Sequence, residues 1–296
     1  LMTIKHLVFS GGGPIGLISY GAAKYLNKEK FWDLKNIKTI YGTSVGAYMG
    51  ILVSLGYEWD WIDDYFIKRP WKKIIDVEIT TILEAYNKKG LLGEKFINDI
   101  IQPLLEAKNL SKDVTFKELY EFNNIEIHIY STEMNGDQMS KLDISYISHP
   151  DMKIIYGLTM SMAFPFIFSP VIEDDKCYID GGLLNNFPIN DCLENNEERE
   201  ILGFDIKFPG EENKITEDST IINYLIVLLK KMKKEIDVKN TDNQVTNKQV
   251  TNVVKCHVNN LHGFKGWIDL LEDENLRIQI IDDGCKMAEE FLLSLD

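Results

Sequence analysis

The sequence predicts an α/β fold in which helices cover a mostly parallel sheet. Two strand-to-helix passages near the start of the chain support this. Residues 4–9 form a β-branched and aromatic run that leads through a glycine turn into helical spacing at 15–27. A second apolar run, 37–41, leads through another turn into a helix-like segment at 47–55. Consecutive strand–helix pairs of this kind need crossover connections, which are typical of parallel sheets.

Later segments continue the alternation of strands and helices. We expect helices at 93–107, 116–120, 153–162, 221–236 and 284–295, strands at 125–130, 177–179 and 201–206, a polar loop at 210–220 and a mobile loop at 237–252. The expected organisation is one domain over residues 1–296. Its motif-bearing core covers about residues 4–206, and residues 207–296 decorate it with helices and loops.

Composition narrows the class of protein and of partner. The chain has 296 residues, of which 45 % are hydrophobic, enough for a large core. Its net charge of −14 argues against a nucleic acid partner, because phosphate binding needs clustered Lys and Arg. The four cysteines are too scattered for a zinc site or a disulfide framework, which suggests a reducing compartment. With no signal peptide and no apolar run long enough to span a bilayer, we expect a cytoplasmic protein whose membrane contact, if any, is peripheral.

The pentapeptide Gly42-Thr43-Ser44-Val45-Gly46 is a Gly-x-Ser-x-Gly pattern between a strand and a helix. A serine on such a sharp turn adopts a strained backbone with its hydroxyl exposed, and the small flanking glycines let other chain segments pass close by. The helix that follows contributes unpaired N–H groups and a positive dipole end. This context makes Ser44 a candidate nucleophile.

The turn from Gly11 to Gly16 also lies between a strand and a helix, and three interpretations compete. Dinucleotide binding fits the Gly11-x-Gly13-x-x-Gly16 spacing, but the second strand lacks the acidic residue that would hold a ribose. Alternatively, N–H groups at Gly12 and Gly13 serve Ser44 as an oxyanion hole, because neighbouring parallel strands end at the same edge of the sheet. The third interpretation is a plain tight turn.

A serine hydroxyl needs a base before it can attack, and the chain offers two kinds. His257 or His262 would complete a Ser–Asp–His order like that of α/β-hydrolases, with Asp180 as the acid. The other candidate is Asp180 itself, which ends a predicted strand and is followed by Gly181 and Gly182. The early position of the Ser44 turn, after only the second strand, favours the aspartate.

Together, the glycine turn, the Ser44 pentapeptide and Asp180-Gly181-Gly182 resemble the patatin-like phospholipases in order and spacing. Further matching stretches are Thr115–Tyr120, Ser161–Pro165 with Pro170-Val171, and Asn186-Phe187-Pro188. The resemblance covers about residues 4–206. One departure is Ile15, where many members carry Lys or Arg, so charge assistance at the oxyanion site is not expected here.

The resemblance implies a three-layer α/β/α fold and a serine lipid acyl hydrolase acting on phospholipids or related lipid esters. It implies that Ser44 attacks the ester, that Asp180 accepts the proton, and that the N–H groups of Gly11, Gly12 and Gly13 hold the oxyanion. It further implies no catalytic histidine, no cofactor and no metal. Partial burial of Asp180 would raise its pKa above about 3.9, which would make it a better base.

Lipid esters lie at interfaces, so an apolar surface near the site is expected. One candidate is the aromatic segment Trp59–Trp71, whose rings would suit the depth of lipid headgroups or would pack a helical cover onto the sheet. The other is Ile221–Lys234, where an apolar run meets four lysines. That segment would lie on an anionic surface or form a core helix with a solvated basic end.

Overall fold

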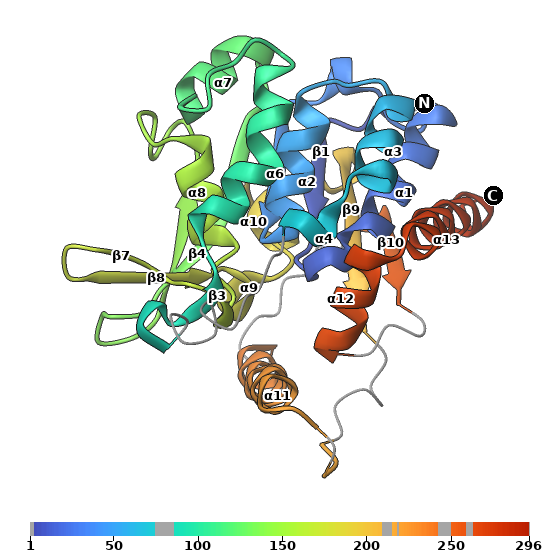
Figure 1. Ribbon diagram of the computed structural model, residues 1–296. Helices are drawn as coiled ribbons and strands as arrows, with labels where there is room; N and C mark the ends of the chain where they lie inside the picture. The colour runs from blue at the N-terminus through green and yellow to red at the C-terminus, as the bar shows by residue number, and fades with distance from the viewer. Residues whose placement is uncertain are drawn as a thin grey trace.

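A computed structural model describes residues 3–74, 86–208, 215–217, 219–241, 250–258 and 263–295. Its centre is a sheet in the order β10-β9-β1-β2-β4-β8-β7, with β5 also pairing with β4 (Figure 1). Five neighbouring strands are parallel: β10 (Val253–His257), β9 (Ile201–Lys207), β1 (His6–Phe9), β2 (Thr39–Thr43) and β4 (Glu126–Glu133). Three more join by antiparallel pairing: β5 (Ser140–Ile144), β8 (Lys176–Asp180) and β7 (Val171–Glu173).

Helices cover both faces of this sheet, which confirms the predicted α/β/α layers. Alternation along β1 shows why: Leu7 and Phe9 join the large apolar cluster on one face, while Val8 joins a smaller cluster on the other. The large cluster is shared with α1 (Leu17–Lys28), α2 (Val45–Ser54), α6 (Glu94–Glu106), α7 (Phe116–Asn123), α8 (Ile154–Ser161) and α13 (Glu274–Leu293). The smaller cluster packs against α10 (Ile189–Asn195).

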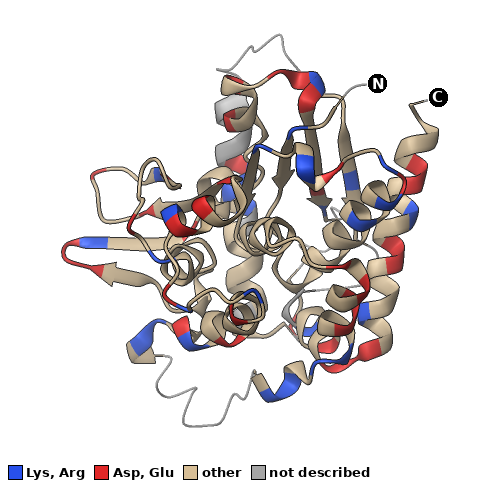
Figure 2. Cartoon of the chain, turned by 90° about the horizontal axis from the view of Figure 1, so that it is seen from above, with Lys and Arg blue, Asp and Glu red and all other residues tan. Residues whose placement is uncertain are grey.

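The C-terminal third, expected as decoration, contributes to both the sheet and a helical layer. Strand β10 extends the parallel sheet beyond β9, and α13 lies along α1. Glycines let the two helices approach closely: a Cβ on Gly21 would come within 2.1 Å of the Ile281 carbonyl oxygen, and one on Gly284 within 2.0 Å of that of Ile18. This helix was expected at 284–295 but begins earlier, at Glu274. It carries acidic and basic residues on its outer side (Figure 2).

The aromatic segment folds as α3 (Trp59–Lys68) and α4 (Trp71–Ile74), and most of its rings face inward. The Trp59 indole donates to Asn27 Oδ1 at 2.8 Å, and the Trp71 indole donates to the Phe66 carbonyl at 2.8 Å. Phe66 and Trp71 are buried, whereas Trp61 is exposed. The segment therefore resembles the expected helical cover more than a membrane-facing surface.

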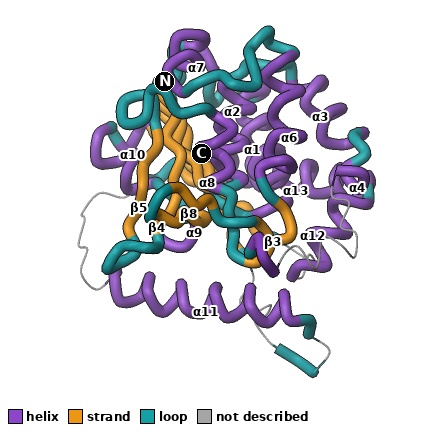
Figure 3. Tube along the Cα trace, turned by 60° about the vertical axis from the view of Figure 1, so that its left-hand side comes forward, coloured by secondary structure: helices purple, strands orange, loops and turns teal. Residues whose placement is uncertain are grey.

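Helix α11 (Ile221–Thr241) lies beyond the carboxyl ends of the parallel strands, apart from the main helical layers (Figures 1 and 3). It extends into the segment expected as a mobile loop; residues 242–249 of that segment, and most of the polar loop at 210–220, lie outside the described residues. The remaining elements are α9 (Gly182–Asn185), α12 (Gly263–Glu272) and a small sheet of β3 (Gly90–Leu92) and β6 (Phe166–Phe168). Within the described ranges, no helix has the length and apolar character needed to cross a bilayer.

Candidate active site

Ser44 stands on a sharp turn between β2 and α2. Its φ of 56° and ψ of −125° lie outside the regions that non-glycine residues favour, as expected for a nucleophile held on an elbow. The turn is this tight because α2 begins directly against the end of β1. A Cβ on Gly46 would lie 2.3 Å from the Phe9 carbonyl oxygen, so glycine is required there.

A buried serine fixes the backbone of this elbow. Ser161, at the end of α8, is fully buried. Its hydroxyl accepts a 2.9 Å hydrogen bond from the Ser44 N–H and donates a 2.6 Å hydrogen bond to the Tyr130 carbonyl on β4. Both polar functions of the Ser161 hydroxyl are used, and the strained residue is tied to the centre of the sheet.

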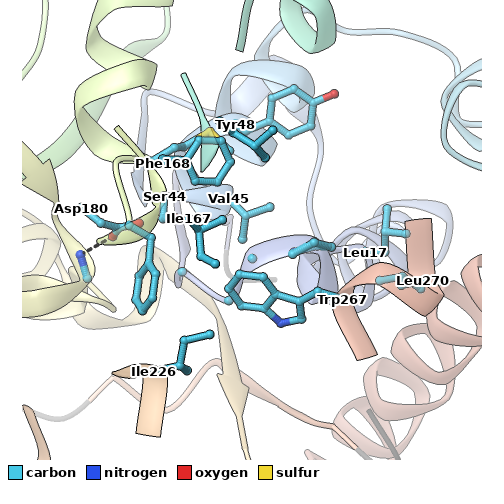
Figure 4. A pocket seen from close by; sticks show the side chains of 18 of the residues that line it. Leu17, Ser44, Val45, Tyr48, Ile167, Phe168, Asp180, Ile226, Trp267 and Leu270 are labelled. Atoms are coloured by element: carbon cyan, nitrogen blue, oxygen red, sulfur yellow. Dashed lines mark hydrogen bonds between the residues drawn. The ribbon is translucent and has the colours of Figure 1, made fainter. Parts of the chain in front are cut away.

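Asp180 ends β8 and faces Ser44 across the edge of the sheet (Figure 4). Its side chain is 2 % exposed, lies close enough to the Ser44 hydroxyl for that group to lower its pKa, and accepts a 2.7 Å hydrogen bond from the Gly182 N–H. Burial raises the pKa of Asp180, whereas the nearby Ser44 hydroxyl and the Gly182 N–H lower it; the balance places the pKa at about 6. A carboxylate with this pKa is ionised at neutral pH and is a better proton acceptor than an exposed aspartate.

The glycine turn lies beside the elbow, and its three N–H groups differ. That of Gly11 donates a 3.0 Å hydrogen bond to the Asn186 carbonyl, while the Asn186 side chain donates back to the Gly11 carbonyl at 3.3 Å. Because the Gly11 N–H is already paired, it cannot donate to an oxyanion in this structure, contrary to expectation. Among the described residues, the N–H groups of Gly12 and Gly13 have no such backbone partner.

Gly13 has a φ of 62°, which favours glycine, and the Trp267 ring of α12 packs over it. A Cβ on Gly13 would lie 2.6 Å from that ring, so the turn is covered by an aromatic side chain. The dinucleotide interpretation gains no support: β2 ends in Thr43 without an acidic residue, and the turn opens onto an apolar cavity shared with Ser44.

The cavity above Ser44 and Asp180 has a volume of about 880 Å³ (Figure 4). Apolar side chains from both halves of the chain form most of its wall, among them Leu17, Tyr48, Phe66, Phe96, Ile167, Phe168, Ile226, Leu229, Trp267 and Leu270. An apolar space of this size with the polar Ser44 and Asp180 side chains on its wall suits a ligand that is largely hydrocarbon.

A buried arginine fixes one side of the cavity wall. Arg277 of α13 is 5 % exposed, and its guanidinium donates to the carbonyls of Leu270 and Leu271 at 3.1 and 3.0 Å and to that of Ile67 at 2.6 Å. These carbonyls lie in the last turns of α12 and α3, where the helix dipoles favour a cation. Arg277 thus joins three helices at the cavity.

No histidine of the described ranges lines the cavity. His6 hydrogen-bonds with Thr39 at the amino end of β1, and His128 lies between Glu126 and Asp143. His257 ends β10 with an exposed side chain, and His262 lies outside the described residues. Over the same ranges, no three His, Cys, Asp or Glu side chains gather as a metal site would require.

The comparison with protein families identifies the family to which the chain belongs. The model of the patatin-like phospholipases matches residues 7–193, which contain the glycine turn, the elbow and Asp180. The chain belongs to this family. The matched range ends within α10, so β9, α11, β10, α12 and α13 lie beyond it.

Individual relatives of this chain share a similar region. Uncharacterized protein R571 of Acanthamoeba polyphaga mimivirus is 31 % identical over 63 % of this chain and 60 % of its own length. "Probable lipid hydrolase 463L" of Invertebrate iridescent virus 6 is 31 % identical over 64 % of this chain and 63 % of its own length. The chain thus matches less than two thirds of the length of these relatives.

Among solved structures, VipD from Legionella pneumophila aligns with 94 % of this chain and 67 % of its own, at 15 % identity and a TM-score of 0.48.

Three residues of the site were not expected to have these roles. Asn186 and Ser161 fall in stretches that resemble the family, but nothing in the sequence distinguishes a serine that braces an elbow from any other helical serine. Arg277 could have been suspected because it interrupts the apolar spacing of a helix, although its carbonyl partners on α3 and α12 depend on the tertiary fold.

Proposed function

We propose that this protein hydrolyses ester-linked fatty acids of phospholipids or related lipids through an acyl-enzyme on Ser44, with Asp180 as the general base. The observation that carries the proposal is the buried Asp180 carboxylate, which has a pKa raised to about 6 and faces Ser44 at the wall of an apolar cavity. Membership of the patatin-like phospholipase family supports the same activity.

In the first half-reaction, Ser44 Oγ forms a bond to the ester carbonyl carbon while Asp180 takes the hydroxyl proton. The carbonyl electrons move to its oxygen, and we assign the N–H groups of Gly12 and Gly13 to hold that oxyanion. When the intermediate collapses, the bond to the leaving oxygen breaks, and Asp180 returns its proton to that oxygen. The acyl chain then remains on Ser44.

In the second half-reaction, water attacks the acyl carbon and gives a proton to Asp180. Collapse of the second intermediate breaks the bond to Ser44, which recovers the proton, and a fatty acid is released. The N-terminus of α2, directly behind Ser44, adds a positive dipole near the developing charge. Each step uses only groups of this chain and water.

The cavity indicates which part of the substrate is held most extensively. Its aromatic and aliphatic wall suits a fatty acyl chain, and Lys207 and Lys234 add positive charge to the lining. The enclosed surface therefore selects for hydrocarbon, and the ester must reach Ser44 from the open side. Contact with a lipid surface and a cytoplasmic location stay predictions.

A fluorophosphonate probe tests this proposal directly. We expect labelling of the wild type, none of Ser44→Ala, and release of fatty acid from a defined phospholipid mixture by the wild type alone. Absence of labelling in folded wild-type protein would contradict a nucleophilic Ser44. Comparing the amounts of lysolipid and of free glycerol released from the same mixture would identify the preferred ester.

A further inference from the structure

Helix α11 presents two apolar faces of different kinds. On its inner side, Ile226 is 4 % exposed and, with Leu229, forms part of the wall of the catalytic cavity. Its outer side bears four large apolar side chains that are exposed by 40 to 69 %: Ile221, Tyr224, Leu228 and Met232. A helix that is apolar on both sides is not explained by packing against the cavity alone.

The four exposed side chains form one continuous stripe. Their positions recur at intervals of three or four residues, so they lie on the same side of the helix along three turns. Single exposed apolar residues are ordinary, but a stripe on one helix indicates a surface that is covered during function. The helix stands apart from the body of the protein, so its outer side is open (Figures 1 and 3).

Charge beside the stripe indicates what covers it. Lys231 is exposed three residues after Leu228, beside the stripe, and Lys234 is exposed where the same helix lines the cavity; both belong to the run Lys230-Lys231-Met232-Lys233-Lys234-Glu235. The whole chain carries a net charge of −14, so this cationic run is opposite in sign to the protein. A second copy of the chain would bring further negative charge, whereas an anionic bilayer offers both hydrocarbon and charge attraction for lysine.

We propose that the outer side of α11 docks this protein on anionic lipid surfaces. The apolar stripe enters the boundary between headgroups and acyl chains, and the lysines contact the lipid phosphates and carboxylates. Because the inner side of the same helix forms part of the cavity wall, docking would place the cavity beside the bilayer. This inference rests on the proposed function in one respect: the lipids of the docked surface are taken to be the source of the substrate.

Binding is measured by sedimentation with Ser44→Ala protein, so that lipid is not consumed. The vesicles are phosphatidylcholine alone, or equal parts of phosphatidylcholine and phosphatidylserine. The test variant is Leu228→Asp with Met232→Asp. The matched control is Ile278→Asp with Leu293→Asp on α13, where two apolar side chains are 38 and 69 % exposed against 40 and 54 % on α11.

We expect binding to the mixed vesicles, weaker binding to phosphatidylcholine, and loss of binding at high salt. The α11 variant should bind at least about tenfold more weakly, and the α13 control should bind like the parent. When Ser44 is kept, the α11 and α13 double variants should both hydrolyse a short soluble ester at the wild-type rate, because none of the four substituted residues lines the cavity. Soluble turnover thus tests the dyad, and sedimentation tests α11.

The proposal would be overturned by equal binding to both kinds of vesicle, by equal loss in the two variants, or by no binding. Concentration-dependent dimers that only the α11 variant abolishes, without vesicle binding, would show that a second copy covers the stripe instead. Circular dichroism of each variant verifies that the fold is kept.

Discussion

The main-chain N–H of Ser44 donates a 2.9 Å hydrogen bond to the Ser161 hydroxyl, which ties the strained elbow to α8 and, through the Tyr130 carbonyl, to β4. Ser161→Ala removes this link and leaves two main-chain groups unpaired in the core. We expect the free energy of unfolding to fall by about 2 kcal/mol and kcat to fall about 10- to 100-fold, with KM little changed. Chemical denaturation and ester kinetics measure both.

A second buried serine provides the control for Ser161. Ser54 donates to the Ile51 carbonyl within α2, away from the elbow, and is equally shielded from solvent. Ser54→Ala should reduce stability without lowering kcat. Equal effects of the two substitutions on kcat would show that Ser161 does not position Ser44.

Removal of either dyad group should nearly abolish turnover. Ser44→Ala and Asp180→Asn are each expected to lower kcat/KM for a soluble ester by about 10³-fold or more, because one loses the nucleophile and the other the base. His257→Ala is the matched control and should keep full activity, since this side chain does not line the cavity. Loss of activity in folded His257→Ala protein would favour a Ser–His–Asp arrangement instead.

The pKa of Asp180 sets a pH dependence. Because this pKa is raised to about 6, the carboxylate is protonated below that pH and cannot accept the Ser44 proton. We expect kcat/KM to fall about tenfold per pH unit below about 6 and to be level above about 7. Initial rates in overlapping buffers measure the profile. A midpoint near 4, the ordinary value for aspartate, would contradict the role of burial.

Gly46→Ala should disrupt the elbow. The new Cβ would lie 2.3 Å from the Phe9 carbonyl oxygen, and neither backbone can shift without disturbing β1 or α2. We expect a loss of about 3 kcal/mol or more in the free energy of unfolding, seen in thermal and chemical denaturation. Gly50→Ala, one turn along α2, meets only an Ile40 methyl group at 2.8 Å and should cost much less.

His128 provides a test of pH-dependent stability away from the active site. Burial opposes its protonation, but hydrogen bonds with Asp143 and Glu126 prevail and raise the pKa to about 9. Because the pKa of His128 is higher in the folded than in the unfolded protein, its protonation stabilises the fold. This contribution to the free energy of unfolding is complete below the unfolded pKa of about 6.5 and is lost as pH rises through about 9.

His128→Gln should therefore destabilise the protein by about 2 kcal/mol near pH 6 and by much less near pH 10. Urea denaturation at both pH values measures the difference between the variants. His257→Gln, at an exposed position, is the control and should show little change at either pH. A pH-independent cost for His128→Gln would mean that its stacking on Tyr41, at a ring distance of 4.3 Å, matters more than its charge.

Local patterns were sufficient to predict the parts of the site that depend on neighbouring residues in the chain. Ser44 is flanked by the glycines that its turn requires, and Asp180 accepts a hydrogen bond from the N–H of Gly182, two residues later. The partners of Gly11 and Arg277 could not be predicted, because they are set by loops and helix ends far along the chain. The N–H of Gly11 is consequently occupied where the family resemblance implied an oxyanion donor.

The same distinction applies to the fold. The first two strand–helix units were predictable because strand, turn and helix are adjacent in the sequence. Strand β10 was missed because its five residues include Lys255 and His257 and follow an Asn-rich segment, so only pairing with β9 identifies it. The expected helix at 221–236 was present, but its exposed stripe could not be distinguished from a core face by spacing alone.

The glycine contact between α1 and α13 has a consequence for synthesis of the protein. Helix α1 is synthesised before most strands of the sheet, whereas its partner α13 follows all of them in the chain. Until α13 emerges, the apolar side of α1 lacks the cover against which Gly21 and Gly284 fit so closely. The nascent chain therefore carries an incomplete core while the segments between α1 and α13 are synthesised, and this interval is a natural point for chaperone assistance.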